Sequence, residues 1–209
     1  WMLGTRNSFF VGIVATLLAP ALGTVAALGL SRPHMPFKAV LMAILISPMI
    51  VPLIITAAGM FFFYSKIGLT HSYLGLILAH TALGTPFVVI TVTATLTGFD
   101  TNLIRASQSL GADTMRTFFK IIMPLILPGV ISGGLFAFIT SFDEVVVVMF
   151  IGSVEQITIP KQMWAGLRQE TSPVILCMAT CLVALSIALL TTVEMLRRRS
   201  ERLRGIKQR

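Results

Sequence analysis

Two adjacent carboxylates late in the chain are the side chains whose types best suit a binding role. Asp143 and Glu144 stand in the stretch ITSFDEVVVVMFIG, directly after Ser141 and Phe142 and directly before four valines. Paired carboxylates beside an aromatic ring offer a place for a cationic ligand through ion pairing and cation–π contact. These four residues are therefore the candidate ligand-binding residues of the sequence.

The depth of the two carboxylates in the membrane depends on whether the helix that carries them is continuous or broken. They follow Pro124 by about twenty residues, and an ideal helix of that length rises about 30 Å, the thickness of a bilayer's hydrocarbon core. A continuous helix places them at the far membrane edge, and a broken one places them deeper. At the edge they would cap a helix or pair with Lys161 or Arg168, which avoids the cost of burying charge. Both interpretations remain open at this stage.

The composition is that of a membrane protein, with 56% hydrophobic and only 11% charged residues. Five apolar stretches, none of which contains Lys or Arg, are long enough to cross a bilayer as helices: 9–30, 40–63, 73–96, 121–151 and 174–196. We therefore expect an all-α polytopic membrane protein with about five transmembrane helices, forming one domain over residues 1–209. The net charge of +8 comes from a few clusters beside these stretches, which argues against a nucleic-acid partner.

Basic residues are distributed unequally between the two predicted faces. Twelve of the sixteen Lys and Arg residues fall on one side, including the tail at 197–209. Cytoplasmic loops retain positive charge, so that side and the C-terminus are predicted to be cytoplasmic, with the tail against anionic lipid. Five spans then place Trp1 outside. Because the chain begins without Met, we expect a sixth helix to precede it.

A polar segment, residues 98–124, interrupts the apolar pattern between the third and fourth predicted spans. Asp100 or Thr101 can cap a first short helix, Gly111 can end it in the left-handed conformation, and Asp113 or Thr114 can cap a second. We name residues 98–124 the cytoplasmic loop. Its apolar stripe fits either a helix lying on lipid headgroups or a knob that docks in a groove of a cytoplasmic partner.

The cytoplasmic loop resembles the EAA motif of the membrane subunits of bacterial ABC importers. That pattern is Glu-Ala-Ala, three residues, Gly, nine residues, Ile, one residue and Leu-Pro. The present chain has Arg105-Ala106-Ser107, then Gly111, Ile121 and Met123-Pro124 at the same spacing. The order of apolar stretches also resembles that family over nearly the whole chain. Arg105 reverses the charge of the motif's Glu, which puts in doubt any ion pair that the usual Glu makes.

The resemblance implies that the loop is a coupling helix seated in a cytoplasmic ATPase subunit. The residues it assigns to coupling are Leu103, Arg105, Ala106, Ser107, Leu110, Gly111, Ala112, Asp113, Met115 and Phe118. The chain lacks a Gly-x-x-x-x-Gly-Lys-Ser/Thr loop. We therefore expect no enzymatic activity and no cofactor on this chain, with ATP and Mg²⁺ bound by two partner ATPase subunits.

The stretch SFDE, followed by ITIPKQMW, resembles the branch of these permeases that serves spermidine and putrescine importers. The resemblance implies a bacterial inner-membrane permease subunit with a second permease subunit and a periplasmic solute-binding protein as partners. It favours Ser141, Phe142, Asp143 and Glu144 as part of the substrate path. The alternative is a self-contained secondary transporter or channel, which needs ionisable groups spread over several spans. His71 and His80, near the start of the third stretch, are expected to be satisfied or exposed side chains.

Overall fold

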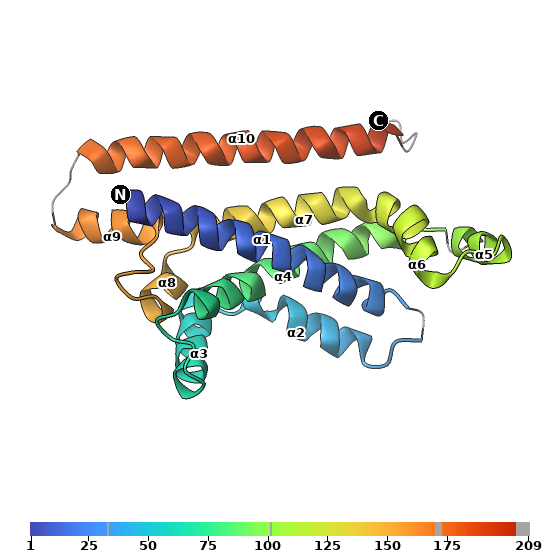
Figure 1. Cartoon of the computed structure of the whole chain (residues 1–209), viewed down its shortest axis with the longest axis horizontal. Helices are drawn as coiled ribbons and strands as arrows, with labels where there is room; N and C mark the ends of the chain where they lie inside the picture. Colours follow the sequence, from blue (N-terminus) through green and yellow to red (C-terminus); the bar gives the residue numbers. More distant parts are fainter. Residues whose placement is uncertain (33, 101, 170–172, 204–209) are drawn as a thin grey trace.

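A computed structural model describes residues 1–32, 34–100, 102–169 and 173–203 of the chain, and every regular element in this part is helical. The elements lie mostly side by side along one long axis (Figure 1). In chain order they are α1 (Met2–Leu30), α2 (Lys38–Ile50), α3 (Leu53–Lys66), α4 (Tyr73–Thr97), α5 (Asn102–Ser109), α6 (Thr114–Thr117), η1 (Phe118–Ile122), α7 (Met123–Asp143), α8 (Val146–Ile151), α9 (Ile159–Gln169) and α10 (Pro173–Leu203).

Four helices are long and apolar enough to cross a membrane, and α2 with α3 makes a fifth span if the bent pair is counted as one. The other four are Met2–Leu30, Tyr73–Thr97, Thr114–Asp143 and Pro173–Thr192. The predicted fold class, an all-α polytopic membrane protein with about five spans, is confirmed.

Helices α1, α4 and α7 form the centre of the bundle and are held together by small residues. Gly23 of α1 faces Val88 of α4, and a Cβ built on Gly23 would lie 2.7 Å from the Cβ of Val88. Gly133 of α7 approaches the same part of α4, where its Cβ would lie 2.7 Å from the Cα of Val88. Such contacts bring helix backbones close together, which favours van der Waals packing between membrane helices. The three helices are therefore interlocked.

The second predicted span is broken. The stretch 40–63 is divided into α2 and α3, which are bent by 106° at residues 51–52. Val51 is extended, with ψ of 134°, as expected for a residue that precedes proline. Pro52 has no backbone N–H and so cannot continue the hydrogen-bond pattern of the helix. We name this bend the elbow. The stretch 40–63 is therefore a single span only if the two bent helices are counted together.

The fourth predicted span is also interrupted. The stretch 121–151 becomes α7, which ends at Asp143, and the separate short helix α8, because Glu144 is extended with ψ of 127°. Helix α8 turns away to pack against α3. Of the two alternatives left open by the sequence, a continuous or a broken helix, the structure shows the broken one, and Asp143 and Glu144 lie at the break.

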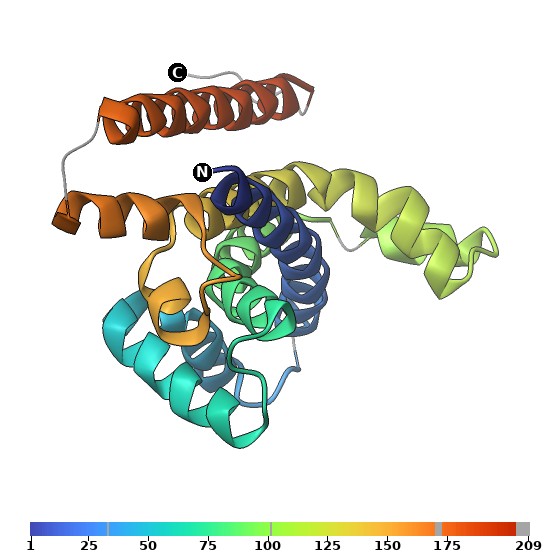
Figure 2. The same cartoon turned by 60° about the vertical axis from the view of Figure 1, so that its left-hand side comes forward.

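The connections gather at the two ends of the bundle. Helices α5 and α6 and the connection from α1 to α2 lie at one end, and α8, α9 and the N-terminus lie at the other (Figure 1). Helix α10 runs along the outside of the bundle in both views and contacts α7 and α9 (Figures 1 and 2). The side chains of the predicted basic tail, residues 197–209, lie outside the described part of the chain.

Candidate functional site

An open-sided cavity of about 590 Å³ lies where the two helix breaks meet. Residues 48–53 of the elbow form one wall, Leu83 and Phe87 of α4 form the second, and residues near the end of α7 form the third. We name it the elbow cavity. Its volume falls in the range of about 300–1,000 Å³ that is typical of small-ligand pockets.

At both breaks, backbone N–H and C=O groups lack the hydrogen bonds that a continuous helix would have supplied. In a membrane protein, non-helical backbone is tolerated where it is buried in protein or lines a water-filled cavity. Membrane transporters commonly place their substrate sites where such discontinuous helices meet. The coincidence of the elbow, the α7 break and one cavity therefore marks this region as a candidate binding site.

The structure separates the two carboxylates that the sequence presented as a pair. Asp143 is exposed and lines the elbow cavity. Glu144 also borders the cavity, but only 5% of it is exposed. Among the described residues, neither carboxylate forms an ion pair with Lys161 or Arg168. Asp143 thus has the position expected of a ligand-binding group, whereas Glu144 has a different environment.

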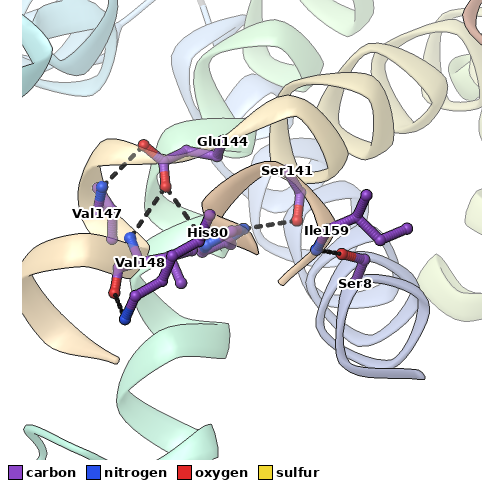
Figure 3. Close-up of polar contacts among 8 residues, drawn as sticks. Ser8, His80, Ser141, Glu144, Val147, Val148 and Ile159 are labelled. Carbon is purple, nitrogen blue, oxygen red and sulfur yellow. Dashed lines mark hydrogen bonds and ion pairs between the residues drawn. The ribbon is translucent and has the colours of Figure 1, made fainter. Parts of the chain in front are cut away.

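Glu144 precedes Val145, the N-cap residue of α8, and its side chain caps the first turn of that helix. Its Oε1 accepts a hydrogen bond of 2.8 Å from the backbone N–H of Val147, and its Oε2 accepts one of 3.2 Å from that of Val148 (Figure 3). A carboxylate at a helix N-terminus satisfies N–H groups that have no partner within the helix. The interpretation of the acidic pair as a helix cap therefore applies to Glu144, and Asp143 remains the candidate for ligand binding.

His80, which was expected to be a satisfied or exposed side chain without a role in the site, joins this junction from α4. Its Nδ1 lies 2.7 Å from the hydroxyl of Ser141, and its Nε2 lies 3.9 Å from Oε2 of Glu144 (Figure 3). His80 is 1% exposed and stands two helical turns after Tyr73, the first residue of α4. An ionisable residue at that depth in an apolar stretch is itself a signal of a functional site. That signal was missed because His80 was placed near the membrane interface.

The far end of α8 is held by a lysine of α9. The Nζ of Lys161 donates hydrogen bonds of 3.1 Å to the carbonyl of Val148 and 3.0 Å to that of Gly152. Partial burial lowers the pKa of Lys161 because it disfavours the charged ammonium. Helix α9 is in turn tied to α1, where Ser8 Oγ accepts a hydrogen bond of 2.9 Å from the N–H of Ile159 (Figure 3). The Glu144 carboxylate thus lies at the N-terminus of α8 and the Lys161 ammonium at its C-terminus. The helix dipole favours a negative charge at the first position and a positive charge at the second.

Replacement of Lys161 with Met is expected to loosen α8 while keeping most of the side chain's volume. Hydrogen bonds to charged groups contribute about 1.5–3 kcal/mol, so the melting temperature of the purified protein should fall by several degrees. Lys66→Met is the matched control, because Lys66 is exposed at the end of α3. Equal melting temperatures for the two variants would contradict this role of Lys161.

Ser141 and Phe142 do not line the elbow cavity. Phe142 is buried, with its ring centroid 5.0 Å from that of Phe9 and 5.3 Å from that of Phe138. Ser141 is bonded to His80. The aromatic ring that lines the cavity belongs to Phe87, which stacks on Phe136 at 6.1 Å. Of the four residues predicted for the substrate path, the structure therefore places Asp143 and Glu144 at the cavity.

The cytoplasmic loop folds as the sequence predicts. Helix α5 ends before Gly111, which has a φ of +79° and thus occupies the left-handed region. Asp113 caps α6, and its Oδ1 accepts a hydrogen bond of 2.6 Å from the N–H of Arg116. Asp100 accepts one of 2.9 Å from the N–H of Asn102, whereas Thr101 lies outside the described residues. The predicted first helix, turn and second cap are confirmed, but the second helix is not short, because it continues through η1 into α7.

The surface of the loop separates into an inner and an outer side. Ser107 is buried and its hydroxyl lies 2.8 Å from that of Thr117, which fixes α5 against α6. On the outside, Leu110 is 89% exposed and Met115 is 66% exposed. Arg105 is exposed, and among the described residues it forms no ion pair. Most of the predicted coupling residues are thus at the surface, whereas Ser107 supports them from within.

Comparison with known proteins identifies the family of this chain. The family described as the inner membrane component of binding-protein-dependent transport systems matches residues 19–202. The chain belongs to this family. This permease is therefore a transport subunit that crosses the inner membrane several times.

Individual relatives of the permease are named as transport system permease proteins. The spermidine/putrescine transport system permease protein PotC of Haemophilus influenzae is 30% identical to the present permease over 194 residues, which cover 93% of this chain and 76% of that protein. The PotC protein of Escherichia coli strain K12 is 28% identical over 193 residues, which cover 92% and 73% of the two chains. The putrescine transport system permease protein PotI of the same strain is 28% identical over 189 residues, covering 84% and 65%.

Solved structures show the same fold. A chain of the MetNI methionine ABC transporter, solved in inward facing conformations, matches the permease with a TM-score of 0.70 at 19% identity, over 98% of this chain and 95% of that one. A chain of a bacterial ABC transporter involved in the import of alginate matches with a TM-score of 0.68 at 15% identity, over 95% and 74%. The interrupted helices of the permease therefore occur within an established transporter fold.

Proposed function

We propose that the permease forms part of the translocation path of an ATP-driven importer for a small cationic solute, a polyamine such as spermidine or putrescine. The observation that carries this proposal is the exposed carboxylate of Asp143 in the elbow cavity, at the meeting point of two helix breaks. The relatives that are named for spermidine and putrescine transport support the same substrate class.

The cavity offers two kinds of contact to an extended polyamine. Asp143 supplies a charge-assisted hydrogen bond to an ammonium group, and Phe87 supplies an aromatic ring for cation–π contact. The elbow side consists mainly of apolar side chains, which suit the methylene segments between the amino groups. A polyamine alternates charged and apolar groups, so this mixture matches it better than it matches a sugar.

The cytoplasmic loop supplies the connection to ATP hydrolysis. In this proposal α5, Gly111 and α6 dock into a groove on an ATPase subunit, with one such subunit for each of two permease subunits. ATP and Mg²⁺ are bound by the ATPase subunits, and the present chain binds no cofactor. The face that carries α5 and the C-terminus is cytoplasmic, as the distribution of basic residues predicts. A periplasmic solute-binding protein delivers the polyamine at the face that carries α8 and α9.

Asp143→Asn tests the proposed site with little change of shape. Loss of a charge-assisted contact costs about 1.5–3 kcal/mol, so the spermidine concentration that half-maximally stimulates ATP hydrolysis should rise by roughly 10- to 100-fold. The measurement uses the complex that co-purifies with the tagged permease, reconstituted in proteoliposomes with its binding protein. Glu155→Gln removes a carboxylate from an exposed loop away from the cavity and serves as the matched control.

Three results would argue against the proposal. An unchanged spermidine dependence in Asp143→Asn would place the site elsewhere. Stimulation of the wild-type complex by sugars or amino acids but by no polyamine would overturn the substrate class. Purification as a lone homomer that conducts ions, without an ATPase or a second permease, would favour a secondary transporter or channel.

A further inference from the structure

His80 contacts both sides of the helix break that carries Asp143. Its Nδ1 lies 2.7 Å from Ser141, two residues before Asp143, and its Nε2 lies 3.9 Å from Glu144, the residue after it (Figure 3). The imidazole is therefore a bridge between the last turn of α7 and the cap of α8. It comes from α4, which is locked to α7 by close packing at Gly133.

The two ring nitrogens of His80 have different surroundings. Nε2 is buried and has no hydrogen-bond partner in the described part of the chain, whereas Nδ1 has the hydroxyl of Ser141. If the hydroxyl donates to Nδ1, the ring proton lies on Nε2 and faces the carboxylate of Glu144. The distance of 3.9 Å between Nε2 and Oε2 is longer than a hydrogen bond, so this contact is electrostatic, beside the two hydrogen bonds from Val147 and Val148.

The position of His80 on α4 relates this bridge to the elbow cavity. Leu83 and Phe87, which line the cavity, follow His80 by three and seven residues. Residues at these spacings lie on one face of a helix, so His80 continues the cavity-lining face of α4 toward the α8 end. There it meets Glu144, which borders the same cavity.

We propose that His80 is a positioning residue for substrate binding: by holding Ser141 and Glu144 it fixes the helix break that directs Asp143 into the cavity. The inference rests on the proposed function, because it assigns His80 an effect on the affinity of the same site. His80 does not contact the polyamine in this proposal. Its loss allows the end of α7 to shift, and Asp143 then meets the ammonium group in a poorer geometry.

The test compares His80→Ala with His80→Asn in the reconstituted complex, with spermidine as the probe. Alanine removes both contacts, whereas the side-chain oxygen of asparagine lies near the place of Nδ1 and accepts a hydrogen bond from Ser141. His80→Ala is expected to raise the half-maximal spermidine concentration roughly tenfold, while the maximal ATPase rate changes less than about twofold. His80→Asn is expected to recover most of the loss. His71→Asn is the matched control, because His71 is exposed and has a φ of +57°, which asparagine tolerates.

A second comparison tests whether His80 and Ser141 act through one contact. Ser141→Ala should also weaken spermidine binding, and the double variant Ser141→Ala/His80→Ala should be little worse than His80→Ala alone. Additive losses would overturn the bridge. A lower maximal rate in His80→Ala with unchanged half-maximal concentration would also overturn it, because it would indicate damage to folding or coupling.

The failure of this inference can be distinguished from failure of the proposed function. If Asp143→Asn weakens the response to spermidine and both His80 variants behave as wild type, the cavity is the site and His80 does not position it. If Asp143→Asn leaves the response unchanged, the proposed site itself is wrong. His80 then has no carboxylate to position, and the inference is overturned with it.

Discussion

Ala106→Asp is expected to abolish the proposed polyamine uptake while leaving the permease inserted and folded. Ala106 is exposed on α5 and lies on the same side of the helix as Leu103 and Leu110, at spacings of three and four residues. If this side docks into a groove of the ATPase, a carboxylate there must be buried without a partner. Such burial costs several kcal/mol, which corresponds to a loss of affinity of roughly 100-fold or more. Spermidine uptake by cells that depend on this importer measures the effect.

The control for Ala106→Asp is the same new charge on the other side of α5. Gln108 is exposed two residues further on, where the helix has turned about 200°. Gln108→Asp should therefore retain uptake, and both variants should reach wild-type levels in the membrane. Loss of the co-purifying ATPase in Ala106→Asp alone would complete the expected pattern. Normal uptake in Ala106→Asp would refute the assignment of α5 as the coupling helix.

Gly133→Leu is expected to prevent formation of a folded permease. A Cβ at this position would lie 2.5 Å from Oγ1 of Thr91 and 2.7 Å from the Cα of Val88, which is closer than non-bonded atoms approach. The backbone of α4 cannot withdraw without losing the hydrogen bond of 2.8 Å from Thr91 to the carbonyl of Gly129. Overpacking by one methyl already costs about 1–3 kcal/mol, and leucine adds a whole side chain. Size-exclusion chromatography of a fluorescently tagged complex should show aggregate or no protein.

The control for Gly133→Leu is a helical glycine with free space around it. A Cβ at Gly59 of α3 would meet no atom within 4 Å, so Gly59→Leu avoids any clash and gains helix propensity. The same substitution should thus be tolerated or stabilising at Gly59. A symmetrical peak at wild-type yield for Gly133→Leu would show that α4 and α7 are not packed as closely as described.

The parts of the fold that local chemistry determines were predictable from the sequence. Apolar length is sufficient to identify membrane spans, and the left-handed Gly111 and the cap at Asp113 follow from the preferences of single residues. The geometry of the elbow was not predictable, because Pro52 indicates that a helix stops but not the angle at which the next one begins. That angle depends on the packing of α3 against α8, a contact between segments about ninety residues apart.

The candidate site was predictable in part for the same reason. Two neighbouring carboxylates looked equivalent in the sequence, and only the fold of α8 turns Glu144 into a cap and leaves Asp143 at the cavity. His80 precedes Ser141 by 61 residues, so no local pattern joins them. Phe87 was not considered because an aromatic residue in an apolar stretch has no distinguishing neighbours. Its place in the cavity depends on the elbow of a different span.

The interlocked glycines of α1, α4 and α7 determine which parts of the permease can act as moving parts. Contacts as close as that between Gly133 and Val88 leave these helices no room to slide, so they behave as one solid frame. The elbow lies opposite this frame across the cavity and has only a two-residue connection between α2 and α3. Under the proposed function, a solute in the cavity therefore meets one wall that belongs to this frame and carries Asp143, and a facing wall that the elbow forms. The proposed recognition of the solute by Asp143 thus depends on helices whose relative positions are fixed by glycine packing.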